Sequence, residues 1–431
     1  MSMQTEALRL DQAPPLSIPL SFFLTAPLAV ATAGALLLWN GSLLFLSHWL
    51  PLTLGLTHLC TLGFLTMVMM GALYQMTPVV AGSPVGRVRL GHAVYALWVG
   101  GVIVLCWGLA RVRPDVVYWA IVVLTLALLL FVIPLGTALL KAPSFDETVL
   151  GMCIAVAALL VAGIFGLWMA HGYGGMQFPG PRPLWLQVHL SVALLGWVGG
   201  LITAVSWQVI PMFYLAEPLS PAIKRTTQGL LVVGVLTPAL VLTASYFGLL
   251  EDDPERSARI AALGTLPALI AVWGLHPITS FASLRRRRRR RIDASLFFWR
   301  AGLLLALPTG AVALCAYLLP TPKWGLLLGW LALWGWAGMI IHGMLTRIVP
   351  FLVWFHRFAS LVGEVPVPSV RGLLPDGWTR LGFGLHAASV VAGVLGIASG
   401  SGLLIRLTGL LVLATALSLA RSLIHVARQR P

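Results

Sequence analysis

The sequence predicts an all-α, polytopic membrane protein with about 12 transmembrane helices. Three observations carry this prediction. Hydrophobic residues make up 59% of the 431 residues and charged residues only 10%, whereas an ordinary soluble domain is about one-quarter charged. The mean hydropathy is +0.93. Apolar stretches also recur along almost the whole chain, each near the roughly 20 residues that a helix needs to cross a hydrocarbon core of about 30 Å.

Proline, glycine and charged residues punctuate these apolar windows and mark the limits of each span. Taken in order from the N-terminus, they justify twelve helices, which we number as spans 1 to 12. The predicted spans are residues 17–39, 52–80, 92–110, 117–140, 148–170, 184–214, 227–249, 258–282, 295–319, 325–354, 380–399 and 402–424.

The segments between the spans are too short to form a separate soluble domain. The longest of them lie around residues 283–294 and 356–379. We therefore expect one integral membrane domain over residues 1–431 that is embedded in the lipid bilayer, with lipids as its immediate partners.

The basic residues predict the orientation. The net charge is +15, and residues 285–291 are seven consecutive arginines, a pattern that can also indicate a nucleic-acid partner. If both termini are cytoplasmic, 19 of the 28 Lys and Arg residues fall in cytoplasmic segments and 6 in external loops, which is the positive-inside distribution. The sequence therefore predicts cytoplasmic termini and no nucleic-acid partner.

Spans 2, 6 and 10 share one spaced motif. In each, a glycine followed by an aromatic residue stands 15 residues before a proline, and a long polar residue stands three before that proline. The three copies are Gly63-Phe64 with Gln75 and Pro78, Gly196-Trp197 with Gln208 and Pro211, and Gly335-Trp336 with Arg347 and Pro350. Because they lie four spans apart, they predict three pseudo-symmetric four-helix units, at about residues 17–140, 148–282 and 295–424. We expect the glycines to allow close helix contact.

The histidines are the candidate functional residues. An imidazole inside a membrane is costly unless it is paired or ligated, so His58 and His189, which open spans 2 and 6 at similar depth, are the candidate cofactor ligands. Neutral imidazole ligates haem iron and copper. A b-type haem held by both side chains is one interpretation; hydrogen bonds to carbonyls across helix contacts are the other. His48 and His171 at external edges and His342 in span 10 are weaker candidate metal ligands.

Other activities have less support in the sequence. All 13 acidic residues lie outside the spans or at their margins, and intramembrane carboxylates are the usual carriers of proton relays and ion coupling. A proton- or sodium-coupled transporter is therefore disfavoured. No HExxH, GxSxG or glycine-rich phosphate loop occurs, so the sequence does not favour a hydrolase or a nucleotide-driven machine.

These features together resemble a known superfamily. Twelve spans in units of four, with a histidine at the outer end of span 2, resemble subunit I of the haem-copper oxidases and nitric oxide reductases. The stretch THLCTLGFLTMVMMGALYQMTPVVAG also resembles the second span of the NnrS family, membrane proteins with haem and copper that are linked to nitric oxide metabolism, with His58, Leu62-Gly63-Phe64 and Pro78 at the matching positions. The segments HLSVALLGWVGGLITAVSWQVIPMFYL, IDASLFFWR and GMLTRIVPFLVWFHRF are similar to bacterial homologues of that superfamily, which implies a bacterial inner membrane.

The chain departs from the oxidases at their metal centre. Trp330, Trp334 and Trp336 stand where the oxidases carry two histidines of span 10, and residues 227–249 contain none of the adjacent histidines that ligate copper there. Terminal oxidase activity is therefore disfavoured, and whether the chain is an enzyme stays open. The resemblance implies haem b, with copper as an open second metal, and a role in electron transfer, gas handling or the nitric oxide stress response with a redox partner. The alternative is a cofactor-free transporter or membrane scaffold that retains the fold.

Overall fold

A computed structural model of the chain describes residues 14–178, 180–250, 253–288 and 293–431. These residues fold into helices with no β-strand among them, and they contain twelve helical spans long and apolar enough to cross a membrane. The prediction of an all-α, polytopic membrane protein is confirmed. Residues 289–291 of the arginine run lie outside the described residues.

The spans coincide one for one with the predicted spans, and their ends lie within four residues of the predicted ends except at the end of span 1 and the start of span 7, which each extend six residues further. They are Ser17–Phe45, Pro51–Val80, Val88–Ala110, Pro114–Leu140, Glu147–Tyr173, Arg182–Tyr214, Pro221–Tyr246, Pro254–Arg285, Ser295–Leu318, Pro322–Arg357, Asp376–Ser399 and Gly402–Arg428. Their α-helices are α1 (Ser17–Asn40), α2 (Pro51–Cys60), α3 (Met67–Val80), α4 (Gly91–Ala110), α5 (Pro114–Leu140), α6 (Glu147–Tyr173), α7 (Arg182–Leu190), α8 (Gly200–Tyr214), α9 (Pro221–Tyr246), α10 (Pro254–Gly264), α11 (Leu266–Leu269), α12 (His276–Arg285), α13 (Ser295–Leu318), α14 (Pro322–Trp330), α15 (Met339–Arg357), α16 (Asp376–Ser399) and α17 (Gly402–Arg428). Short 3-10 helices are η2 (Gly41–Phe45), η4 (Val88–Leu90), η8 (Ala359–Leu361) and η9 (Val370–Leu373).

Prolines set where several spans begin. Pro51, Pro114, Pro221, Pro254 and Pro322 each occupy the first position of a helix. Proline is favoured there because the first turn of a helix needs no backbone N–H donor and proline's fixed φ angle suits the helix. These residues therefore place the membrane-entry points of five spans directly from the sequence.

Four spans contain a π-helical segment. The segments are η3 (Thr61–Thr66), η5 (Ser191–Gly199), η6 (Ile270–Leu275) and η7 (Leu331–Gly338). Three of them, in spans 2, 6 and 10, contain the glycine-aromatic pair of the repeated motif. π-Helical turns are rare and occur often at functional sites, so the repeat marks a shared backbone irregularity as well as a shared sequence.

Spans 2, 6 and 10 form the centre of the bundle. In their most apolar windows, 61%, 72% and 67% of the residues are buried, against 22–50% in the other nine spans. The three spans contact one another: the Trp197 indole donates to the Thr66 hydroxyl at 3.1 Å, and the ring of Phe64 lies 6.1 Å from that of Trp334. The other spans therefore surround a central group made of the three repeated helices.

Each motif glycine lies between the span before it and the span after it. A Cβ atom built on the glycine would meet a small or branched apolar side chain on both neighbours. These contacts are Ala29 at 2.9 Å and Val102 at 3.6 Å for Gly63, Ala158 at 2.9 Å and Val235 at 3.5 Å for Gly196, and Leu305 at 3.8 Å and Val390 at 3.6 Å for Gly335. The contacts fall on spans 1 and 3, 5 and 7, and 9 and 11, so the three glycines are equivalently placed.

A second set of equivalent contacts follows eight residues later on each central span. At this level the central span packs against the span before it, and in each case one of the two contacting residues is a glycine. The pairs are Gly71 with Phe22, Ala204 with Gly151 and Gly343 with Phe298. Close contact at Gly63 and Gly196 is thus a feature of the fold, whereas a rotation that relates the complete four-helix units stays a prediction.

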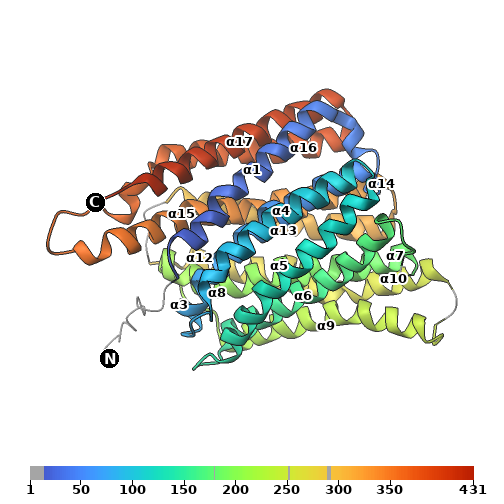
Figure 1. Cartoon of the computed structure of the whole chain (residues 1–431), viewed down its shortest axis with the longest axis horizontal. Helices are drawn as coiled ribbons and strands as arrows, with labels where there is room; N and C mark the ends of the chain where they lie inside the picture. Colours follow the sequence, from blue (N-terminus) through green and yellow to red (C-terminus); the bar gives the residue numbers. More distant parts are fainter. Residues whose placement is uncertain (1–13, 179, 251–252, 289–292) are drawn as a thin grey trace.

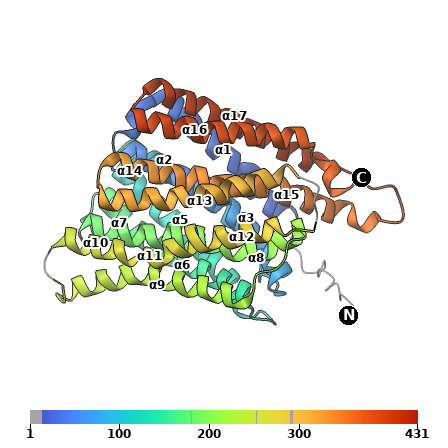
Figure 2. The same cartoon turned by 180° about the vertical axis from the view of Figure 1, so that it is seen from behind.

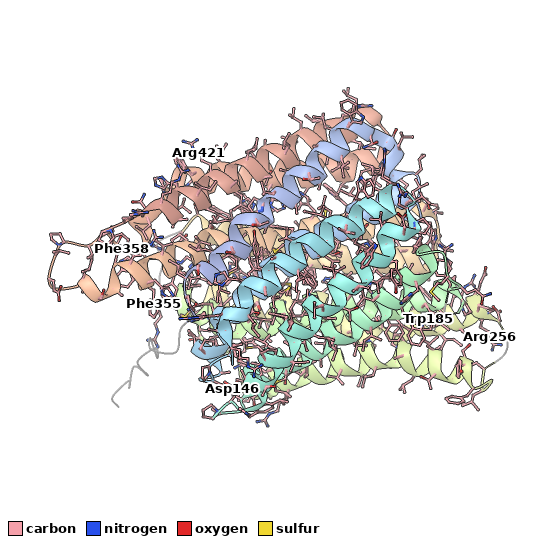
Figure 3. The ribbon with its side chains drawn as sticks, in the orientation of Figure 1. Asp146, Trp185, Arg256, Phe355, Phe358 and Arg421 are labelled. Carbon is pink, nitrogen blue, oxygen red and sulfur yellow. The ribbon has the colours of Figure 1, made fainter. Side chains whose placement is uncertain are left out.

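The first and last spans close the bundle. A Cβ atom on Gly34 of α1 would lie 2.6 Å from the backbone nitrogen of Leu413 and 2.9 Å from the carbonyl of Gly409 in α17, so the two backbones touch. Figures 1 and 2 show α1 beside α17 in both views. The start of α1 and the end of α17 lie at the same end of the bundle, where Figure 3 also shows Phe358 and Arg421, while Trp185 and Arg256 lie at the opposite end.

Candidate functional site

His58 lies in the last turn of α2, three residues before η3 begins, near the end of the bundle opposite the start of α1. Its Nδ1 lies 2.8 Å from the Leu54 carbonyl oxygen. Because a carbonyl oxygen can only accept, Nδ1 carries the proton and donates, which leaves Nε2 with its lone pair. Histidines that bind a metal commonly donate their other ring N–H to a backbone carbonyl in this way.

His189 stands at the corresponding end of span 6. Its ring interacts with the backbone of Ala162 on α6, and its Nδ1 is buried without a hydrogen-bond partner. The ring lies against Gly166 of α6, where a Cβ atom would come within 2.8 Å of the imidazole Cε1. Trp185 is four residues earlier on α7, and its ring packs at 5.2 Å on that of Phe165. A half-buried imidazole with an unused nitrogen thus stands among aromatic side chains.

A cofactor site shared by His58 and His189 stays a prediction. His58 and His189 are close enough to interact electrostatically, and both are half-buried. The residues therefore fit an axial-ligand role toward haem on two observations: one imidazole has its tautomer fixed by a carbonyl, and the other has a buried nitrogen with no partner. The hydrogen bond of His58 satisfies its Nδ1 in either role, whereas the unpaired nitrogen of His189 is unexplained in a purely structural pair, since an unpaired buried nitrogen costs free energy.

The two edge histidines have separate surroundings. His48 lies between η2 and α2, its ring 4.9 Å from that of Trp49, and its Nδ1 is buried without a partner beside Gly325 at the start of span 10. Burial lowers the pKa of His48, which lies outside the spans. His171 is in the last turn of α6 and half-buried. Within the described residues no three His, Cys, Asp or Glu side chains gather as a metal group.

His342 is paired with a histidine that the sequence analysis gave no role. Its Nδ1 lies 3.0 Å from Nδ1 of His386 on α16, and the two side chains are 1% and 0% exposed. The Nε2 of His386 lies 3.1 Å from the Trp334 carbonyl oxygen, in the π segment η7, and the two rings stack at 4.0 Å. The Trp334 indole donates to Ser389, which in turn donates to the His386 carbonyl.

The acceptors in this network fix its protons. The Trp334 carbonyl can only accept, so His386 carries its proton on Nε2 and its Nδ1 is an acceptor. His342 must then donate from Nδ1. The pair is a buried, neutral hydrogen-bond chain between spans 10 and 11, with every nitrogen of His386 used. His342 and His386 therefore act as a packing network that holds η7 against α16.

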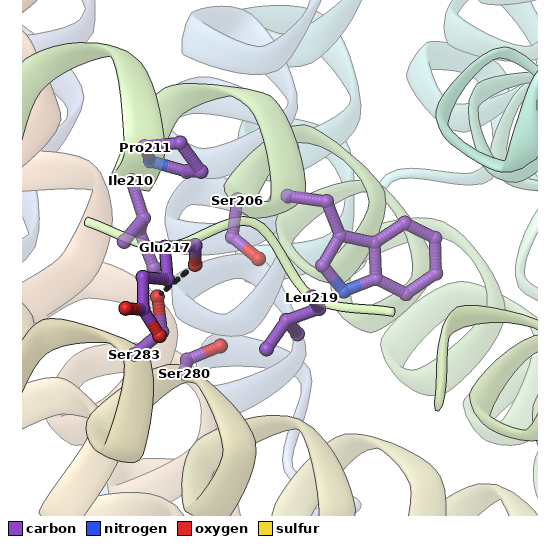
Figure 4. A pocket seen from close by; sticks show the side chains of 8 residues that line it. Ser206, Ile210, Pro211, Glu217, Leu219, Ser280 and Ser283 are labelled. Atoms are coloured by element: carbon purple, nitrogen blue, oxygen red, sulfur yellow. Dashed lines mark hydrogen bonds between the residues drawn. The ribbon is translucent and has the colours of Figure 1, made fainter. Parts of the chain in front are cut away.

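Spans 6 and 8 enclose a second polar cluster (Figure 4). His276 bonds to Ser206 at 2.9 Å, and its Nδ1 is buried without a partner, as are the hydroxyl oxygens of Thr203 and Ser280. A cavity of about 10 Å³ lies beside Ser206, Ser280 and the loop residue Glu217. That volume is about what one water molecule needs. Trp273, His276, Ser280 and Ser283 share one face of the helix by their spacing, which the sequence analysis overlooked.

A charged cluster ties together the loops at the terminal end of the bundle. Asp293 accepts hydrogen bonds from Arg347 at 2.8 Å and from Arg371 at 3.2 Å, and its other oxygen accepts from the backbone and hydroxyl of Ser295. Burial by itself would raise the pKa of Asp293, but Arg347, the Ser295 bonds and Arg371 together hold it below the ordinary value of 3.8. Of the three motif positions, Arg347 alone meets a carboxylate; Gln75 is buried and Gln208 is exposed.

Comparison with known proteins adds no family. No protein-family model matches the chain, and no curated protein matches it. The site is therefore defined by the residues of this chain alone.

Proposed function

We propose that this chain is a haem-binding electron-transfer protein of the membrane, with His58 and His189 as axial ligands of a b-type haem. The observation that carries the proposal is the hydrogen bond from His58 Nδ1 to the Leu54 carbonyl, which leaves Nε2 free beside a second imidazole whose Nδ1 has no partner. Their position on two of the three central spans supports it, because a ligand between these helices would be surrounded by the bundle.

Each neighbouring residue has a definite task in this proposal. The Leu54 carbonyl holds His58 in one tautomer and orientation. Gly166 lets the His189 ring lie directly against α6, because any side chain there would overlap it. Phe165 and Trp185 exclude water on the His189 side. A bound haem supplies an iron that accepts and returns one electron, and two imidazoles leave it no open position for a gas.

The proposal also has a cellular setting. The basic residues of the sequence favour cytoplasmic termini, which would place the histidine pair toward the external face of a bacterial inner membrane. An electron-transfer role requires a redox partner that reaches this face. Copper stays a secondary proposal, for which His48 and His171 are the remaining candidate ligands, because His342 is bonded to His386.

The absorption spectrum of purified protein from a haem-supplied host tests the proposal. We expect a b-type Soret band with the low-spin features that two imidazole ligands produce, no carbon monoxide adduct, and oxygen reduction at background. His58→Ala and His189→Ala should each lose or shift the band, because each removes one nitrogen from the iron. His92→Ala is the matched control: this exposed histidine bonds to Ser17 near the other end of the bundle, and its loss should leave the spectrum unchanged.

Other outcomes are equally informative. Colourless wild-type protein despite full haem supply would refute the cofactor proposal and leave the cofactor-free transporter or scaffold as the better reading. A spectrum sensitive to His58→Ala but not to His189→Ala, together with a carbon monoxide adduct, would indicate a single axial ligand and gas handling. Strong oxygen or nitric oxide consumption would contradict the inference that the missing oxidase histidines exclude terminal oxidase activity.

A further inference from the structure

A basic groove lies where α16 begins and α17 ends, at the end of the bundle opposite the histidine pair. Its volume is about 380 Å³, and its lining includes Trp378, Arg421, His425, Arg428 and Arg430. No carboxylate lines it among the described residues. Three guanidinium groups without a lining counter-charge repel one another, and an anion seated between them would remove that repulsion.

The groove has an ordered floor. The guanidinium carbon of Arg421 lies 3.9 Å from the ring centroid of Trp378, a cation–π contact, and the same indole packs on His425 at 5.0 Å. The amide of Gln429 in turn bonds to Nε2 of His425 at 3.1 Å. The Trp378 ring therefore holds Arg421 in place, so that this arginine loses little side-chain freedom when it binds an anion.

An apolar track leads from the groove into the membrane. Arg421 is on the outer surface of the bundle (Figure 3), and Leu417 and Leu410 precede it on α17 at helical spacing, 60% and 51% exposed. At a rise of about 1.5 Å per residue, these two leucines lie within the depth of one leaflet from Arg421. Residues three, four and seven apart share one helix face. A single face of α17 thus changes from exposed leucine at membrane depth to arginine at its end, which matches the acyl chain and phosphate of one lipid.

We propose that this groove is a binding site for the phosphate of an anionic glycerophospholipid, whose acyl chains lie along the leucines of α17. Basic pockets at the cytoplasmic ends of membrane helices recognise such headgroups, and tryptophan favours the same interfacial depth. A soluble phosphate shares the headgroup chemistry but cannot use the leucine track. The site does not rest on the proposed haem function, because it lies at the other end of the molecule.

Native mass spectrometry tests this with protein offered equal amounts of phosphatidylglycerol and phosphatidylcholine. We expect selective retention of phosphatidylglycerol. Arg421→Gln/Arg428→Gln should weaken it by about fivefold for each arginine, since one basic residue near anionic lipid contributes about 1 kcal/mol. Arg87→Gln/Arg89→Gln, which removes the same charge from another loop at this end, is the control and should keep the selectivity.

Two further arms separate the sources of phosphate. Inorganic phosphate at millimolar concentration should not displace the lipid; complete displacement would overturn the lipid assignment in favour of a free anion. Trp378→Leu keeps all the basic residues but removes the ring on which Arg421 packs. It should reduce phosphatidylglycerol retention by less than the double arginine variant does. Equal phosphatidylglycerol retention by wild type and by both groove variants would refute the site.

Discussion

Replacing Asp293 by asparagine should destabilise the protein strongly, although the change removes only one charge. Asp293 is 12% exposed and Arg347 is 13% exposed, with Nη1 and Oδ2 2.8 Å apart. Asparagine can still accept the Ser295 bonds, but it leaves the guanidinium groups of Arg347 and Arg371 facing each other without a counter-charge. Removing one partner of a buried ion pair costs about 3–5 kcal/mol, and we expect a fall in the free energy of unfolding of that order.

Denaturant titration in detergent micelles measures this fall, and the chain contains a matched control. Asp115 pairs with Arg113 at 2.7 Å, but their side chains are 59% and 53% exposed. Exposed pairs contribute about 0.2–1 kcal/mol, so Asp115→Asn should have a small effect. The double variant Asp293→Asn/Arg347→Gln should recover part of the loss, because it removes one of the unpaired cations. Equal stability of Asp293→Asn and Asp115→Asn would refute the reasoning.

Three further predictions concern other parts of the fold. Because the pKa of Asp293 is lowered, its stabilising effect should be complete well above the unfolded pKa of 3.8, decrease as pH falls through 3.8, and be lost below the lowered pKa of the folded state; the difference between wild type and Asp293→Asn, followed by pH-dependent unfolding, should shrink accordingly. Gly196→Ala should lower the thermal midpoint because its Cβ would overlap Ala158, whereas Gly335→Ala, with no contact closer than 3.4 Å, should leave it nearly unchanged; the reverse order would contradict the contact argument. His386→Phe should destabilise the protein by about 1–3 kcal/mol in chemical unfolding, because the Trp334 carbonyl and His342 lose a partner, and an unchanged midpoint would show that the network is not stabilising.

The sequence was sufficient to predict the spans because a lipid environment leaves few alternatives. In a helical membrane protein the backbone polar groups of a span are bonded within its own helix. An apolar run of sufficient length between charged or proline-rich segments therefore predicts one transmembrane helix. The repeated glycine-aromatic pairs were equally visible, since their spacing is fixed by chain position. Gly63, Gly196 and Gly335 therefore led directly to equivalent contacts in the structure.

The candidate site was only partly predictable, because pairing between spans depends on helix rotation. Depth along the chain was enough to select His58 and His189 as a pair, whose imidazoles interact electrostatically in the structure. The partner of His342 was not identified, since His386 enters from the opposite side of the membrane and shares no motif with it. The loop residue Asp293 gave no sign that it would meet Arg347. The glycine-aromatic pairs coincide with three of the four π segments, but the pairs alone do not predict a π-helical backbone, because a π turn leaves the apolar pattern of the span unchanged.

The contact between Gly34 and Gly409 has a consequence for the order of the chain. Because α1 and α17 touch along their backbones, and the start of α1 and the end of α17 lie at one end of the bundle, the first and last helices pack together like helices that are consecutive in the chain. A circular permutant with joined termini and a new opening in the turn before Glu147 would begin with span 5 and end with span 4. Every helix would keep its packing neighbours, so we expect this permutant to adopt the same fold although its synthesis begins at a different helix.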